Sequence, residues 1–168
     1  MTATAYEKLE QRFRRILVLG DAGEALQWDY ATMMPAGGGP GRGEQLAELS
    51  GVCHSLLSDS ETGDLLEEAD QDGNLNNWQS ANLQAMKRKW VHATALSEDL
   101  VLAFSKACTG CETVWREARA ASDFAAVLPH MEALLGLVRQ CASAKAEKLG
   151  LSPYDALLDE FEPGGRSA

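Results

Sequence analysis

The chain has 168 residues and a mass of 18.1 kDa, with 45% apolar and 24% charged residues, which is typical of one globular domain over residues 1–168. Its net charge of −10, without a basic stripe, excludes nucleic acid as an expected partner. Four cysteines are too few for a disulfide scaffold, and no segment resembles an export signal or a membrane span. We therefore expect a cytoplasmic protein with reduced thiols and no membrane partner.

The distribution of apolar residues predicts an all-α protein with six to seven helices in an antiparallel bundle-like array and no sheet. Apolar side chains recur at helical spacing, and no segment alternates as a half-buried strand would. The first predicted helix follows a stripe from Tyr6 to just before Pro35, where a bend can form near Gly20 and Gly23. Residues 36–43, A-G-G-G-P-G-R-G, have too much backbone freedom for a stable helix and are predicted to form a loop.

The rest of the chain contains apolar stripes and cap residues typical of further helices. Ser97 precedes two acidic residues and is predicted to be an N-cap, and Asp123 with the serine before it is predicted to cap the next helix. Pro129 can occupy the first position of a helix. The predicted stripes cover residues 46–57, 65–69, 75–96, 100–118, 134–142 and the short segment 153–161.

Cys108 and Cys111 have the spacing of a redox pair or of half a zinc site. However, both lie inside the helix predicted over residues 100–118, on the same stripe as Phe104 and Trp115. A redox pair of this type normally opens a helix after a strand, and free cysteine is among the most buried residue types. We therefore interpret both thiols as small core residues.

None of the three histidines is predicted to bind a metal. A zinc peptidase helix carries H-E-x-x-H, in which two imidazoles lie four residues apart and a glutamate activates water. His54, His92 and His130 are each followed by a residue other than glutamate and lie more than thirty residues apart. We predict that each is a surface or half-buried side chain. With no nucleophile elbow or phosphate loop either, we predict no catalytic and no metal-binding residue in this chain.

Asp29 and Arg42 flank the glycine-rich segment, one on each side. A charge-assisted hydrogen bond between them would fix the path of the chain between the two helices. We therefore predict that these two side chains form a structural pair.

The most informative tract is W-D-Y-A-T-M-M-P-A-G-G-G-P-G-R-G-E-Q-L-A-E-L, which begins at Trp28. A tryptophan with A-R and D-F segments and a Y-D-x-L-L-D-x-x-E-P-G tract follow it in order. Through these patterns the chain resembles the N-terminal region of the thermostable carboxypeptidase (carboxypeptidase Taq) family of metallopeptidases. The residues that carry the resemblance are Trp28, Asp29, Thr32, Met34, Pro35, Arg42, Gln45, Trp115, Arg119, Asp123, Phe124, Tyr154, Asp155, Asp159, Glu162, Pro163 and Gly164.

The resemblance implies a mostly helical, much longer enzyme that depends on zinc or cobalt and removes single C-terminal residues from peptides. Members of the family are typically homodimeric and cytosolic. Their metal ligands and catalytic glutamate belong to an H-E-x-x-H helix and a later glutamate, both beyond the E-P-G tract. The resemblance therefore assigns no catalytic or metal-binding role to any residue here. The matching positions belong to a helical region that covers one side of the substrate groove.

Two hypotheses about function follow from the sequence. In the first, the chain is the N-terminal part of a metallocarboxypeptidase whose catalytic part lies outside this sequence, and that part or a homologous chain is its partner. In the second, it is a free-standing truncated homologue that acts as a protein-binding or oligomerisation module through an apolar face. Both predict that the chain hydrolyses no peptide by itself, with peptide as a substrate only in the full-length context.

Overall fold

The computed structural model describes residues 3–167, which form seven α-helices, one 3₁₀ turn and their connections, without a strand. This confirms the predicted all-α class. The elements are α1 (Ala5–Thr32), η1 (Ala36–Gly38), α2 (Gly39–Ser58), α3 (Ser60–Asp70), α4 (Asn77–Thr94), α5 (Glu98–Ala121), α6 (Phe124–Leu149) and α7 (Pro153–Phe161).

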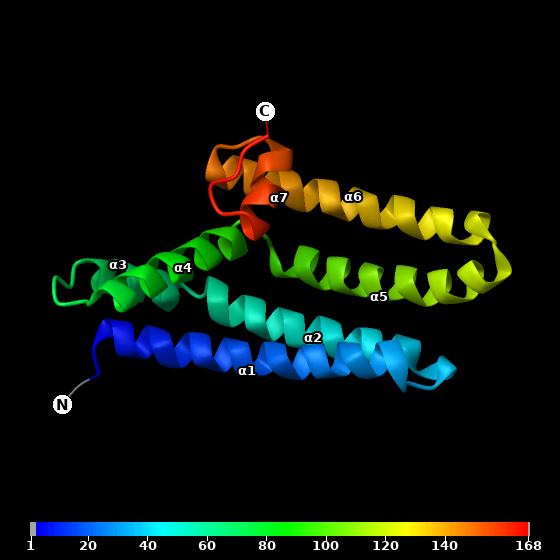
Figure 1. Ribbon diagram of the computed structural model, residues 1–168, viewed down its shortest axis with the longest axis horizontal. Helices are drawn as coiled ribbons and strands as arrows, with labels where there is room; N and C mark the ends of the chain where they lie inside the picture. The colour runs from blue at the N-terminus through cyan, green and yellow to red at the C-terminus, as the bar shows by residue number, and fades with distance from the viewer. Residues whose placement is uncertain (1–2, 168) are drawn as a thin grey trace.

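Four long helices, α1, α2, α5 and α6, lie side by side in this order and alternate in direction (Figure 1). Each of them contacts the next, whereas α3 and α4 gather beside the N-terminal half of α1, and α7 packs on the C-terminal end of α6. Within residues 3–167, no helix combines the length and the apolar character needed to cross a membrane. Much of the molecule is therefore one row of helices, and α2 contacts α3 and α4 in addition to its two neighbours in the row.

The main hydrophobic core lies at one end of this row, where α1 meets α3 and α4. Leu9 of α1 is fully buried there, and Leu83 of α4 is 2% exposed. Burial of such side chains is the main favourable contribution to folding. The buried members of this core are Ala5, Tyr6, Leu9, Phe13, Leu65, Leu66, Ala69, Leu83 and Met86.

Helix α1 begins and ends where local sequence signals place it. Thr4 and Glu7 form a capping box, in which the Thr4 hydroxyl accepts from the Glu7 amide and the Glu7 carboxylate accepts from the Thr4 amide. The helix passes through Gly20 and Gly23 as one element and ends shortly before Pro35. The predicted first helix is therefore confirmed.

The prediction of a loop over residues 36–43 is wrong. Ala36–Gly38 form a 3₁₀ turn, and α2 begins at Gly39. The glycines are helical because α2 packs closely against α5: a Cβ at Gly43 would lie 3.4 Å from the Thr109 methyl group, and one at Gly39 would lie 3.3 Å from the Thr113 hydroxyl. Contact between the two helices thus outweighs the low helix propensity of glycine.

Two expectations about Pro129 and Trp78 also differ from the structure. Helix α6 begins at Phe124 behind its N-cap Asp123, so Pro129 lies inside it rather than at its first position. Pro129 is exposed, so water can reach the carbonyl that loses its helical donor. Trp78 belongs to the stripe predicted over residues 75–96 but is 87% exposed, because α4 packs through a face about 140° away that carries Leu83.

Candidate functional site

Arg42 ties the start of α2 to the end of α1. Its guanidinium lies 2.6 Å from the Asp29 carboxylate and donates a 2.6 Å hydrogen bond to the Leu26 carbonyl. Its Nε donates to the Gln45 side chain at 2.9 Å. The predicted pairing of Asp29 with Arg42 is therefore confirmed, and it holds the glycine-rich turn between the two helices in place.

Asp29→Ala is expected to lower the free energy of unfolding by about 1 kcal/mol, or Tm by about 2–4 °C. The effect is modest because the Asp29 side chain is 37% exposed and Arg42 keeps its bonds to Leu26 and Gln45. Thermal unfolding followed by circular dichroism measures it. Asp21→Ala, at an exposed position of the same helix, is the matched control. Equal Tm values for the two variants would show that the pair contributes no stability.

Tyr30, which is 1% exposed, connects α1 to α5 across α2. Its hydroxyl donates to the Thr109 carbonyl at 3.0 Å and lies 2.7 Å from the Thr113 hydroxyl. The Arg116 guanidinium donates to the Tyr30 carbonyl at 2.5 Å and lies 4.1 Å from the centre of its ring. Sequence periodicity places Tyr30 only on a helical stripe, because its hydrogen-bond partners lie about eighty residues away.

The aromatic residues that carry the family resemblance lie on the surface. Trp28 is 64% exposed, Phe124 64% and Tyr154 67%. Trp115 is 43% exposed, and the Arg119 guanidinium lies 5.2 Å from its ring. The helices described here therefore do not account for the presence of these large apolar side chains.

Asp159 is the centre of a second network, in which α7 and the residues after it are fixed to α4. Its Oδ1 accepts from the Gly164 amide at 3.0 Å and from the Arg166 guanidinium at 3.1 Å. Its Oδ2 lies 3.1 Å from Nε2 of His92. The amide of Gly164, followed by His92 and Arg166, stabilises the carboxylate and lowers the pKa of Asp159 to about 2.

The residues of the E-P-G tract and those after it lie against α7, through hydrogen bonds to Asp155 and Asp159. Gly164 has a φ of 78°, which favours glycine, and Glu162 and Pro163 are exposed. Asp155 accepts a 2.6 Å hydrogen bond from the Ser167 amide, which lowers the pKa of this carboxyl group. The tract thus follows a defined path after α7.

Two of the three histidines contradict the prediction of surface or half-buried side chains. His54 is 8% exposed and His92 is 5% exposed, whereas His130 is exposed. His92 is buried because Asp159 provides a hydrogen-bond partner that the sequence does not reveal. His54 faces the start of α5 near Glu98, and burial lowers its pKa.

The donor groups do not fit the zinc or cobalt ion that the family resemblance implies. Within residues 3–167, no three His, Cys, Asp or Glu side chains converge as metal ligands. Cys108 and Cys111 are free and only half-buried, so the prediction that they are core residues holds in part. Burial raises the pKa of Cys108, which disfavours the nucleophilic thiolate. The described residues can therefore position helices, and their donor groups do not form a metal site.

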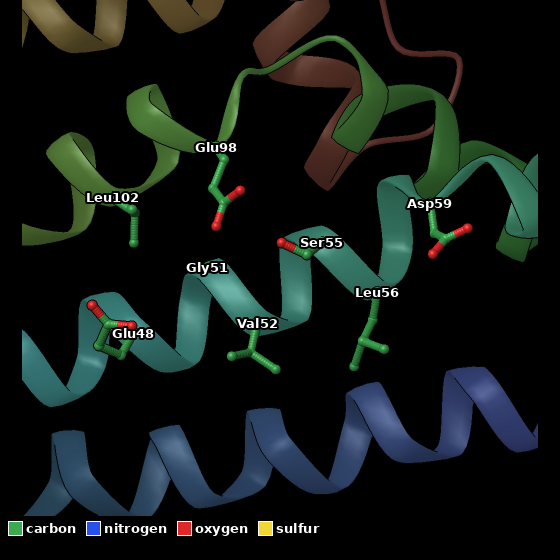
Figure 2. A pocket seen from close by; sticks show the side chains of 8 residues that line it. All are labelled: Glu48, Gly51, Val52, Ser55, Leu56, Asp59, Glu98 and Leu102. Carbon is green, nitrogen blue, oxygen red and sulfur yellow. The ribbon is translucent and has the colours of Figure 1, made fainter.

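The carboxylates that line a recess between α2 and α5 are an example of donor groups that do not converge. The recess has a volume of about 270 Å³. In Figure 2, Glu98 projects from α5 toward Gly51, while Glu48 lies on α2 and Asp59 lies just after the last residue of α2. These three side chains therefore do not form one site.

A second recess, of about 490 Å³, lies between α1, α2 and α5. Its lining is mainly apolar and includes Leu19, Leu46, Leu49 and Phe104. Residues of all three helices, among them Gly20 of α1, Cys53 of α2 and Cys108 of α5, complete its lining.

Comparison with known proteins identifies the family. The carboxypeptidase Taq (M32) metallopeptidase model matches residues 8–168. Thermostable carboxypeptidase 1 of Thermus thermophilus is 29% identical over 97% of this chain and 34% of its own length. Thermostable carboxypeptidase 1 of Pyrococcus furiosus is 32% identical over 93% of this chain and 31% of its own length. The chain thus spans about a third of the length of these relatives.

A solved structure shares the same fold. Trypanosoma cruzi metallocarboxypeptidase 1 is 34% identical with a TM-score of 0.76, and the match covers 96% of this chain and 32% of that one. Nearly all of the helical arrangement described above thus recurs within a much longer protein. The chain belongs to the carboxypeptidase Taq (M32) metallopeptidase family.

Proposed function

We propose that this chain supplies the N-terminal, groove-covering helical region of a metal-dependent carboxypeptidase and is not catalytic by itself. The observation that carries the proposal is that a metallopeptidase family matches residues 8–168, while relatives named carboxypeptidases are about three times as long. In this proposal residues 1–168 act as one helical domain, and the zinc or cobalt ion is held by the part of the fold that this chain does not span. A cytoplasmic location and a homo-oligomeric assembly are further parts of the proposal.

The two polar networks support this role. The Arg42 contacts join α1 to α2, and the Asp159 contacts join α7 to α4. Both hold helices in fixed relative positions without presenting a reactive group. Such a scaffold suits a region that shapes a groove for a peptide whose cleavage takes place elsewhere.

The purified 168-residue chain is expected to release no C-terminal amino acid from peptides, with or without added zinc or cobalt, because its donor groups do not converge. Product analysis by mass spectrometry, with the Pyrococcus furiosus relative assayed in parallel, measures this. Metal-dependent release by the isolated chain would overturn the proposal. A matching loss of activity on chelation would exclude a contaminating metal-independent peptidase.

The second candidate is a free-standing protein-binding or oligomerisation module. The exposure of large apolar side chains, such as Phe124 at 64%, favours it. In that case the isolated chain would form a stable oligomer, which sedimentation velocity over a range of concentrations measures. A monomer at all concentrations would speak against this candidate.

A further inference from the structure

One side of the row of helices carries an apolar trough. It begins in the recess between α1, α2 and α5, into which Phe104 and Cys108 of α5 project. Gly20 and Gly23 of α1 line the same recess, and apart from the neighbouring backbone of α1 no atom lies within 4 Å of where their Cβ atoms would be. No side chain of the described residues therefore fills the space beside α1 at these two glycines.

Helix α6 extends the trough with a stripe of exposed apolar side chains. Phe124, Leu128, Met131 and Leu135 recur at helical spacing and are 64%, 41%, 48% and 46% exposed. Val127 lies about 60° from Phe124 and about 40° from Met131 around the helix and is 4% exposed, so the edge of the stripe turns toward α5, which α6 contacts. Helix α6 therefore has an unpartnered apolar face in addition to the face that packs on α5.

The two apolar features lie on the same side of the row. His130 of α6 lines a different recess together with Lys106 of α5 and Glu44 of α2. On the helical wheel of α6, the row that includes Val127 lies between His130 and Met131, so these two side chains leave α6 on either side of the row that faces α5. Phe104 and Lys106 point about 200° apart on α5, so the recess that Lys106 lines lies on the opposite side of the row from the recess that Phe104 lines. The side with Phe104 is thus mainly apolar, with Glu24 as a charged residue in the lining of its recess, whereas Glu44 and Lys106 line the recess on the other side.

The exposed area indicates that a large surface is uncovered. A folded monomer of 18.1 kDa exposes about 8,100 Å². This chain exposes 10,564 Å², which is roughly 2,500 Å² more. An excess of this size is in the range that a permanent interface covers on one partner. Stable domains also pack two or more layers of helices, whereas α1, α2, α5 and α6 form one row.

We propose that this apolar trough, formed by Phe104 and Trp115 of α5 and by Leu128, Met131 and Leu135 of α6, is where the remaining part of the carboxypeptidase fold packs. The occupant follows from the comparisons, since relatives place about two-thirds of their length outside the region matched by this chain. That part must contact a surface of this region. The proposal rests on the proposed function and identifies the surface that serves it.

The test uses a fusion protein in which this chain replaces the matching region of the Pyrococcus furiosus carboxypeptidase. Leu128→Glu with Met131→Glu places two carboxylates in the trough. These changes are expected to lower the soluble peptidase activity of the fusion by about 100-fold or more, because burying unpaired charges is strongly unfavourable. Val52→Glu with Ala103→Glu, both exposed outside the trough, form the matched control and are expected to change activity less than about twofold.

The same two pairs of substitutions are also made in the isolated 168-residue chain. Because Leu128 and Met131 are exposed in it, the variant should keep its helical circular dichroism and its Tm. Retained folding of the isolated variant with loss of activity in the fusion would support docking at the trough. A loss of helical structure in the isolated variant would contradict the exposed stripe on which the proposal depends.

Three other outcomes would overturn the proposal. The first is a fusion that stays active and stable with both glutamates. The second is a parent fusion whose catalytic part stays unfolded while this chain melts normally. The third is a dimer of the isolated chain that the two glutamates dissociate. The dimer would assign the trough to a second copy. Peptide release by the isolated chain would refute the proposed function, whereas the stability of the fusion would still report on docking.

Discussion

Asp159→Ala is expected to lower the free energy of unfolding by roughly 3–5 kcal/mol, because it removes one partner of a buried polar network. The Gly164 amide, the Arg166 guanidinium and Nε2 of His92 would each lose the carboxylate. Nδ1 of His92 is already buried without a partner, so the imidazole would have none in the variant. Denaturant unfolding at neutral pH measures the change. Glu147→Ala, at an exposed position of α6, is the control and should cost less than about 0.5 kcal/mol.

The pH dependence of the free energy of unfolding distinguishes the contribution of the Asp159 charge from that of its packing. Its pKa of about 2 in the folded chain lies below the ordinary value near 3.9, so the ionised carboxylate stabilises the folded state above about pH 4. That contribution, roughly 2–3 kcal/mol, is lost as the pH falls from about 4 through 2. The difference in stability between the parent and Asp159→Asn should therefore be constant above pH 4 and shrink below it. A difference that is the same at pH 2 and pH 6 would show that the network does not depend on the charge.

Gly43→Leu is expected to lower the free energy of unfolding by roughly 2–3 kcal/mol, because overpacking forces neighbouring elements apart. The position of a Cβ at Gly43 is already 3.4 Å from the Thr109 methyl group, so further carbons would push α2 away from α5. The Tyr30 hydroxyl bonds to Thr109 in the same region and would be disturbed as well. Thermal and denaturant unfolding measure the loss.

Gly41→Leu is the matched control for that substitution. Gly41 lies two residues earlier in α2, is exposed, and has no other atom within 4 Å of where its Cβ would be. Leucine there is expected to leave stability unchanged or raise it by about 0.5 kcal/mol, since glycine is a poor helix former. If both leucine variants were equally stable, close packing of α2 on α5 would not be the reason for glycine at position 43.

The sequence by itself determined the features that depend on neighbours within about one helical turn. The helical periodicity gave the all-α class, Ser97 and Asp123 are N-caps, and Pro153–Phe161 form α7 as predicted. The pairing of Asp29 with Arg42 was also predictable, since the two residues flank one short turn. The tracts that identify the family are likewise visible without a structure.

Tertiary structure alone decided the features that join distant segments. Residues 39–43 are helical because α5 lies against them, and His92 is buried because Asp159, 67 residues later, provides its hydrogen-bond partner. The trough arises because α1, α5 and α6 leave one side of the row uncovered. Local propensity amounts to tenths of a kcal/mol per residue, whereas a helix contact or a buried carboxylate contributes several. Such contacts override local preference, and no pattern of neighbouring residues records them.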